Sequence, residues 1–264
     1  MIKLRFFFIC LVMIGIGYST TKGQQLRISD NQRYIQKADG KPFLWLGDTA
    51  WELFHKLNRE EATEYLTNRA NKGFTVIQAV VLAENDGLRT PNPYGDVPFE
   101  EMDPTRPNED YFKHVDFIVN KAEELGLYIG MLPTWGDKVR SENPGAGPVV
   151  FNSDNAEIFG NYLGQRYKNK PIIWILGGDR NVMDMEVFEI WNAMANGIQE
   201  GNEDNHLISY HPRGTSTSAY WYHNKPWLDF NMYQSGHERF NSVYTYAEDM
   251  YMLHPPKPFI EIGR

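Results

Sequence analysis

The chain has 264 residues, 42% of them hydrophobic and 14% aromatic. This composition supports one large core or at most two modest ones and excludes a disordered chain. The formal charge of -8, with acids and bases interspersed, excludes the basic face that nucleic-acid binding needs, so we expect a small or neutral partner.

The first 23 residues predict a secretory signal peptide. Lys3 and Arg5 precede an apolar segment over residues 6–18, and small and polar residues follow it. This segment is shorter than the roughly 18 to 20 residues of a spanning helix, although a retained N-terminal anchor is an alternative. Cys10, the sole cysteine, would leave with the peptide. We therefore expect a secreted, periplasmic or cell-surface protein without a disulfide or a thiol nucleophile.

From residue 40 onward, short apolar runs alternate with amphipathic segments. Asn58 is expected to cap the first helix and Gly73 to end it. In chain order, the pattern predicts strand 42–51, helix 58–73, strand 74–86, helix 108–126, strand 127–138, helix 155–167, strand 171–176, helix 185–198, strand 206–212, a weak helical stretch, strand 228–236, helix 242–254 and strand 257–261.

Such an alternation predicts a parallel sheet. Because no Gly-x-Gly-x-x-Gly fingerprint is present, it favours an α/β fold of the (β/α)₈ TIM-barrel type over a doubly wound sheet. The pattern stops at the seventh strand, so we expect residues 25–264 to be one catalytic domain, truncated at its C-terminus and insoluble or inactive alone. The closing Glu-Ile-Gly-Arg matches one frame of a common sequencing adapter, which predicts that the native sequence ends near Ile260. Codons other than GAG-ATC-GGA-AGA there would contradict this.

Polar and aromatic side chains follow the predicted strands, at the end of a barrel where active sites lie. Carboxylates and amides bind sugar hydroxyls, and a sugar ring stacks on Trp or Tyr, whereas a phosphate would need a glycine-rich helix start or a cationic clamp. The histidines lack the spacing of a zinc site, so we expect no metal and no cofactor. The residues expected to bind substrate are Asp48, Trp51, Gln78, Asn85, Trp135, Arg180, His211, Gln234 and His237, and Glu84, Asp86 and Asp137 stand at the same strand ends.

The segment "PIIWILGGDRN" (171–181) predicts a buried strand that ends at two glycines and then presents an acid, a base and an amide. Glycosidic hydrolysis needs one carboxyl to protonate the leaving oxygen and a second to attack or to activate water, and Asp179 is the best placed first member. The alternatives are that Asp179 only caps the next helix, that Asp48 caps a helix after its own strand, and that Trp51 and Trp135 are core residues.

The ordered blocks "FLWLGDTAW", "GFTVIQAVVLAEN", "LYIGMLPTWGDK", "KPIIWILGGDRN", "ISYHPRG" and "FNMYQSGH" resemble the apiosidase-like family of glycoside hydrolases, many from gut and soil Bacteroidetes. The resemblance covers roughly residues 25 to 260. It implies a (β/α)₈ barrel that removes apiose from side chains of the plant pectic polysaccharide rhamnogalacturonan II. It also implies that Asp179 is the acid/base.

The family's second carboxylate is a glutamate after the seventh strand, in a block resembling KP-x-x-(D/N)-G-E-P-x-Y-E. This chain matches only "KPFI", so we expect the nucleophile beyond Ile260, and Glu261 stands about two positions early. The expected mechanism is retaining, with the carboxyl groups about 5 to 5.5 Å apart. Alternatives are another exo-acting glycosidase, such as one releasing arabinofuranose, a non-catalytic carbohydrate-binding barrel, and, more distantly, a metal-dependent barrel hydrolase.

Overall fold

The computed structural model describes residues 25–84, 86–140 and 147–262. The predicted signal peptide, with Cys10, and the predicted substrate-binding residue Asn85 lie outside the described residues. None of the helices within these ranges has both the length and the apolar composition needed to cross a membrane.

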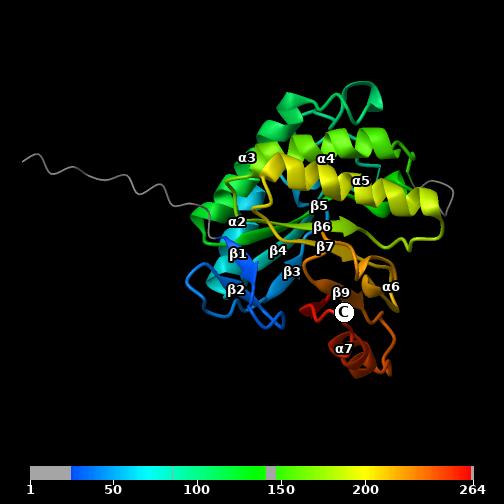
Figure 1. Cartoon of the computed structure of the whole chain (residues 1–264). Coiled ribbons are helices and arrows are strands. Elements are labelled where there is room, and N and C mark those ends of the chain that lie inside the picture. The colour runs from blue at the N-terminus through cyan, green and yellow to red at the C-terminus, as the bar shows by residue number, and fades with distance from the viewer. Residues whose placement is uncertain (1–24, 85, 141–146, 263–264) are drawn as a thin grey trace, which may run out of the picture.

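A curled parallel sheet forms the centre of the molecule (Figure 1). Strand β9 extends the curve beyond β7, because Ser209 Oγ donates to the Phe230 carbonyl at 2.6 Å, and β10 pairs with β9 in parallel. The α/β fold of the (β/α)₈ type is therefore confirmed, with all seven predicted strands in the predicted order. These strands are β3 (Gly47–Thr49), β4 (Val76–Leu82), β5 (Tyr128–Thr134), β6 (Ile172–Gly177), β7 (Ile208–His211), β9 (Asn231–Gln234) and β10 (Phe259–Glu261).

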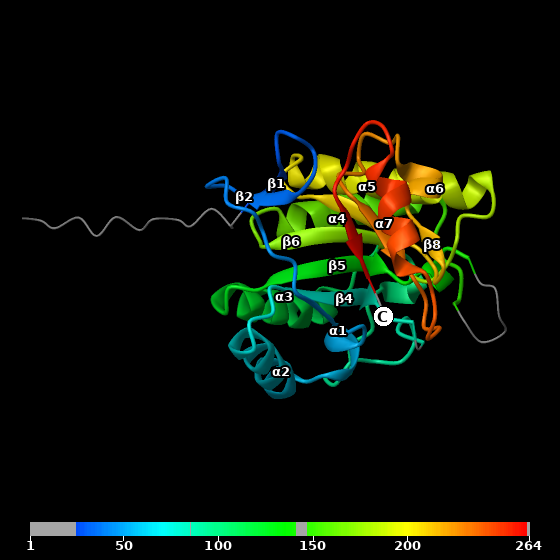
Figure 2. The ribbon, with the colours of Figure 1, turned by 90° about the horizontal axis from the view of Figure 1, so that it is seen from below.

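Helices connect these strands and cover the outer face of the sheet, as Figure 2 shows for α2 and α3 beside β4 and β5. Asn58 caps α2 as predicted, since its side chain accepts from the backbone of Glu60 and Glu61, and Gly73 follows the helix at φ +84°. The helices are α1 (Leu53–Lys56), α2 (Arg59–Asn71), α3 (Glu109–Glu124), α4 (Ser153–Tyr167), α5 (Met185–Asn202), α6 (Ala219–Tyr222) and α7 (Val243–Tyr251), with 3₁₀ turns η1 (Glu100–Met102) and η2 (Gly136–Lys138).

Two pieces of antiparallel structure were not predicted. The hairpin of β1 (Leu26–Ile28) and β2 (Ile35–Lys37) lies at the amino end of the barrel, where Leu26 and Ile35 are buried in the cluster that includes Val76 and Tyr128. Strand β8 (Ser216–Thr217) pairs with β9 before α6. Both elements are too short for periodicity to identify them.

Side chains along each strand alternate between two cores. Ile77, Ala79 and Val81 of β4 pack in the layer between sheet and helices, whereas Val76 and Val80 pack in the barrel interior. This alternation decides which side chains at the strand ends face the interior and which face the helices.

Helices α4 and α5 lie side by side with their backbones in contact (Figure 1). Four glycines, Gly160, Gly164, Gly197 and Gly201, form the crossing. A Cβ atom on Gly197 would lie 2.0 Å from the Glu157 carbonyl oxygen, and one on Gly160 would lie 2.4 Å from the Met194 carbonyl oxygen. The glycines therefore permit a close approach that any side chain would prevent.

We expect Gly197→Ala to lower the free energy of unfolding by about 1 to 3 kcal/mol, because the added methyl group forces the helices apart. Helix propensity alone predicts the opposite result, because it favours Ala over Gly by about 1 kcal/mol. Denaturant unfolding measures the change, with Asn196→Ala at the neighbouring exposed position as the control. If Gly197→Ala is as stable as Asn196→Ala, the crossing does not depend on the glycine.

Candidate active site

Strand β6 ends in a turn that the sequence Gly-Gly-Asp makes possible. Gly177, Gly178 and Asp179 have φ of +87°, +119° and +49°. A Cβ atom on Gly177 would lie 2.3 Å from the His211 carbonyl oxygen, and one on Gly178 would lie 2.8 Å from the Trp135 ring. Aspartate is one of the few residues other than glycine that tolerate a positive φ. Held in this sparsely populated conformation, Asp179 occupies a backbone position typical of functional sites.

The capping alternative for Asp179 is excluded, because Asp184 caps α5 and its side chain accepts from the Val187 backbone at 2.9 Å. Asp179 Oδ1 is buried and makes no hydrogen bond. Its titratable neighbour is His211 at the end of β7, whose Nδ1 lies 3.8 Å from this oxygen. The carboxyl is thus directed at the site and not used by the helix.

Three rings from three strand ends pack against one another, and His211 is the one whose distance to this carboxyl is 3.8 Å. The ring centroids of Trp51 and Trp135 lie 5.1 Å apart, and those of His211 lie 5.5 and 5.6 Å from the two indoles. His211 is 1% exposed. Burial lowers the pKa of His211, and this effect is larger than that of the nearby Asp179 charge, which would raise the same pKa. The imidazole is therefore neutral at neutral pH. The predicted aromatic residues therefore come together, but the core alternative holds for Trp135, which is 3% exposed in the barrel interior, whereas Trp51 stays partly exposed.

Several buried polar atoms at the carboxyl ends of the strands have no hydrogen-bond partner within the described part of the chain. Buried polar groups are normally hydrogen-bonded, so a group of such atoms indicates a place where a ligand supplies the partners. The atoms are Trp135 Nε1, Asp179 Oδ1, Arg180 Nε, both ring nitrogens of His211 and Gln234 Oε1. Gln234 follows Phe230 and Met232 on the interior-facing side of β9.

Arg180 and Glu84 complete this group. The Cβ and Cγ atoms of Arg180 lie over Gly136, where a Cβ atom would approach them to 2.9 and 2.8 Å. Tyr210 donates from its hydroxyl to the Arg180 carbonyl at 2.8 Å, and Arg180 Nη2 lies 3.8 Å from Glu84 Oε1. The pKa of Glu84 is raised, first by burial and then by the charge of Asp137, while Arg180 opposes the shift.

Asp48 is not brought to this group. It pairs in register with Ile77, whose side chain packs between sheet and helices, so Asp48 faces α2. Its Oδ2 accepts from the Tyr65 hydroxyl at 2.8 Å and from Arg69 Nε. It does not cap α1 either, whose N-cap is Glu52. The geometry gives Asp48 a structural partner in the helix layer.

We expect Asp48→Asn to lower the free energy of unfolding by about 1 kcal/mol at neutral pH while leaving substrate affinity unchanged. Burial would raise the pKa of Asp48, but the hydrogen bonds from Arg69 and Tyr65 outweigh it and lower this pKa. A lowered carboxyl pKa stabilises the fold above the unfolded-state value of about 3.9. The difference from wild type should therefore shrink as the pH falls through that value and below. Unfolding at pH 7 and pH 3 tests this, and a stability difference that persists unchanged at pH 3 would contradict it.

Three other predicted residues also lie apart from the group around Asp179. Gln78 is within β4, inside the barrel between the interior-facing Val76 and Val80, and its Oε1 is buried without a partner. His237 is exposed in the loop after β9. Glu261 pairs in register with Tyr233, and its Oε1 accepts from Ser235 Oγ at 2.5 Å. Its neighbours in the strand, Ile260 and Ile262, pack in the barrel interior, so Glu261 faces outward.

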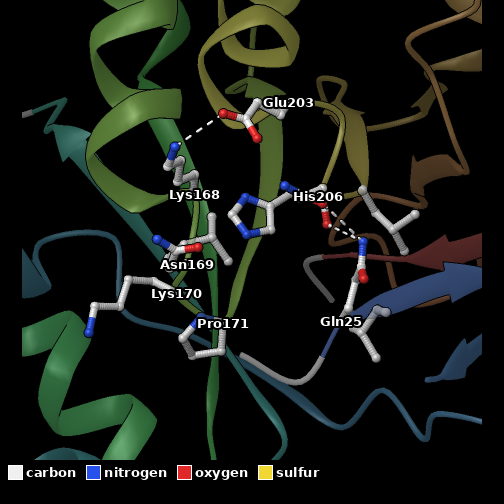
Figure 3. Close-up of a pocket in the computed structure, with 11 residues that line it drawn as sticks. Gln25, Lys168, Asn169, Lys170, Pro171, Glu203 and His206 are labelled. Carbon is white, nitrogen blue, oxygen red and sulfur yellow. Dashed lines mark hydrogen bonds and ion pairs between the residues drawn. The ribbon is translucent and has the colours of Figure 1, made fainter. Parts of the chain in front are cut away.

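A cavity of about 340 Å³ lies at the opposite, amino end of the barrel (Figure 3). Its charged side chains are paired, since Lys168 Nζ lies 3.1 Å from Glu203 and Lys170 Nζ lies 2.8 Å from Glu123. Burial lowers the pKa of His206 to about 4, so this imidazole is neutral. Because active sites of such barrels lie at the carboxyl ends, this cavity is not the candidate active site.

Comparisons with known proteins identify the family of the chain. The family model described as "Apiosidase-like, catalytic domain" matches residues 29–263. A glycoside hydrolase family 5 structure from Bacteroides vulgatus is 33% identical with a TM-score of 0.78, and covers 90% of this chain and 53% of that chain. A structure described as "Glycoside hydrolase" is 35% identical with a TM-score of 0.76, covering 90% and 56%.

More distant structures share the fold alone. The catalytic domain of the endoglucanase Cel5A from Thermobifida fusca is 13% identical with a TM-score of 0.57, and covers 90% of this chain and 72% of that chain. No curated protein matches the chain. The chain spans about half the length of the two more similar structures. Because the family model matches residues 29–263, the chain belongs to the apiosidase-like family.

Proposed function

We propose that the protein is a secreted glycoside hydrolase that releases a terminal pentose, apiose, from side chains of plant pectic glycan. The observation that carries the proposal is Asp179, held at positive φ with a buried, unpartnered carboxyl oxygen beside two indoles. Family membership supports carbohydrate as the substrate. The signal-peptide pattern of residues 1–23 supports secretion.

In this proposal Asp179 is the general acid. It protonates the glycosidic oxygen as the bond to the anomeric carbon breaks, and then accepts a proton from the water that completes hydrolysis. Trp51, which is partly exposed, supplies the apolar surface against which a sugar ring stacks, and the buried Trp135 packs against its indole. The unpartnered nitrogens of His211 and the Gln234 amide oxygen are available to its hydroxyls.

In this proposal the second carboxyl is a glutamate beyond Ile260, as the family resemblance implies, at a position facing the barrel interior. We do not assign Glu261 to this role, because it faces outward with Tyr233. For a retaining mechanism, the nucleophile stands about 5 to 5.5 Å from the Asp179 carboxyl. It forms a glycosyl–enzyme bond that water then hydrolyses.

The test is to incubate the full-length protein with apiose-bearing and arabinofuranose-bearing pectic oligosaccharides and to identify the released sugars by chromatography. Release of apiose supports the proposal. Release of arabinose alone assigns a different exo-acting glycosidase. Binding of the oligosaccharide without release of any sugar assigns a non-catalytic carbohydrate-binding barrel.

A further inference from the structure

A buried ion pair fixes the loop that follows β4. Lys138 Nζ donates to the Ala83 carbonyl at 2.6 Å, to the Glu84 carbonyl at 3.1 Å and to both carboxylate oxygens of Asp137 at 2.9 Å. Both charged side chains are 0% exposed, and the Gly147 backbone donates to Asp137 at 2.8 Å. The hydrogen bonds of the ammonium group thus hold the backbone of Ala83 and Glu84 against the end of β5.

The Glu84 carboxylate, in contrast, is engaged only loosely, by Arg180 and by the Trp135 side chain. It is 44% exposed, and its ion pair with Arg180 is 3.8 Å long, beyond hydrogen-bond distance. Arg180 is 12% exposed and its backbone carbonyl is fixed by Tyr210. A carboxylate on a rigid backbone, with loosely engaged oxygens, is arranged to accept hydrogen bonds from a ligand.

The surroundings of Glu84 argue against a role in stability. The negative charges of Asp137 and Asp179 act on it, and with burial they raise the pKa of Glu84 against the pull of Arg180. A partly exposed pair with Arg180, 3.8 Å long, contributes little to stability. Perturbed groups of this kind, kept at a stability disadvantage, are found at functional sites.

We propose that Glu84 is a second substrate-binding carboxylate, which accepts hydrogen bonds from two adjacent hydroxyls of the bound sugar. The inference rests on the proposed function, since it deepens the description of the same site. A carboxylate can accept from two hydroxyls at once, so Glu84 selects sugars that present such a pair. The Lys138–Asp137 pair acts as the positioning device for this carboxylate.

The matched test compares Glu84→Gln with Asp86→Asn. Asp86 lies two residues after Glu84, and its carboxylate is already paired with Arg89 at 2.7 Å, so Asp86→Asn removes the same charge from a carboxylate that has a partner. Both changes are made in the full-length protein carrying Asp179→Asn, so that binding of an apiose-bearing rhamnogalacturonan II oligosaccharide is measured by calorimetry without turnover. We expect Glu84→Gln to weaken the affinity on the order of tenfold, and Asp86→Asn to change it less than twofold. The thermal unfolding midpoint of Glu84→Gln should not fall.

Equal affinity in the two variants overturns the inference, as does a loss of affinity that accompanies a lowered unfolding midpoint. If the wild-type protein, with Asp179 and Glu84 both intact, binds the oligosaccharide but releases no sugar, the proposed hydrolysis fails while the role of Glu84 stands. If it binds no oligosaccharide at all, both are overturned.

Discussion

Replacing Asp179 with asparagine is expected to lower kcat/KM on a natural pectic oligosaccharide by about 10²- to 10⁴-fold, because a general acid contributes a factor of that size. Asparagine has the same shape as aspartate and accepts a positive φ, so the turn at φ +49° should persist. The loss is therefore expected in kcat, with the KM and the unfolding midpoint close to those of wild type. Steady-state kinetics on the full-length protein measure it.

The leaving group provides the control. The nitrophenolate of a nitrophenyl glycoside leaves without being protonated. The glycosidic bond of this substrate should therefore break in Asp179→Asn at a rate near that of wild type. An equal loss with the natural and the activated substrate would contradict the role of general acid. A lowered unfolding midpoint would instead assign Asp179 a part in the fold.

Replacing Lys138 with methionine is expected to lower the free energy of unfolding by about 3 to 5 kcal/mol, because it leaves the Asp137 carboxylate buried and without its cation. The Ala83 and Glu84 carbonyls lose their donor in the same step. The double variant Asp137→Asn with Lys138→Met removes both charges, so we expect it to recover a large part of the loss. Denaturant unfolding of the three proteins measures these differences.

An exposed pair of the same length is the matched control. Lys113 Nζ lies 2.8 Å from Asp110, and Lys113 is 59% exposed. Lys113→Met is expected to change the free energy of unfolding by less than about 1 kcal/mol, because water screens an exposed pair. If the Lys138 and Lys113 variants lose equal stability, burial of the first pair is not what makes it important.

Local sequence patterns were sufficient for the order of strands and helices. Each apolar run from residue 42 to 261 contains a barrel strand, although strand 42–51 narrows to the three residues Gly47–Thr49. The cap at Asn58 was also predictable, because capping uses contacts within three residues. The β1–β2 hairpin was missed, since its three-residue strands carry too few alternations to be recognised.

For the site, the sequence by itself determined that Asp179 follows a buried strand and that Trp51, Trp135, Arg180 and His211 stand at strand ends, because sequence position and strand order are local properties. Only the tertiary structure decided the direction of the side chains. Successive residues of a strand face opposite sides of the sheet. Asp48 and Glu261 stand at positions that face away from the barrel interior, so Asp48 points to the helices and Glu261 points outward. The use of Lys138 to hold Glu84 depends on contacts between residues 54 positions apart, which no local pattern encodes.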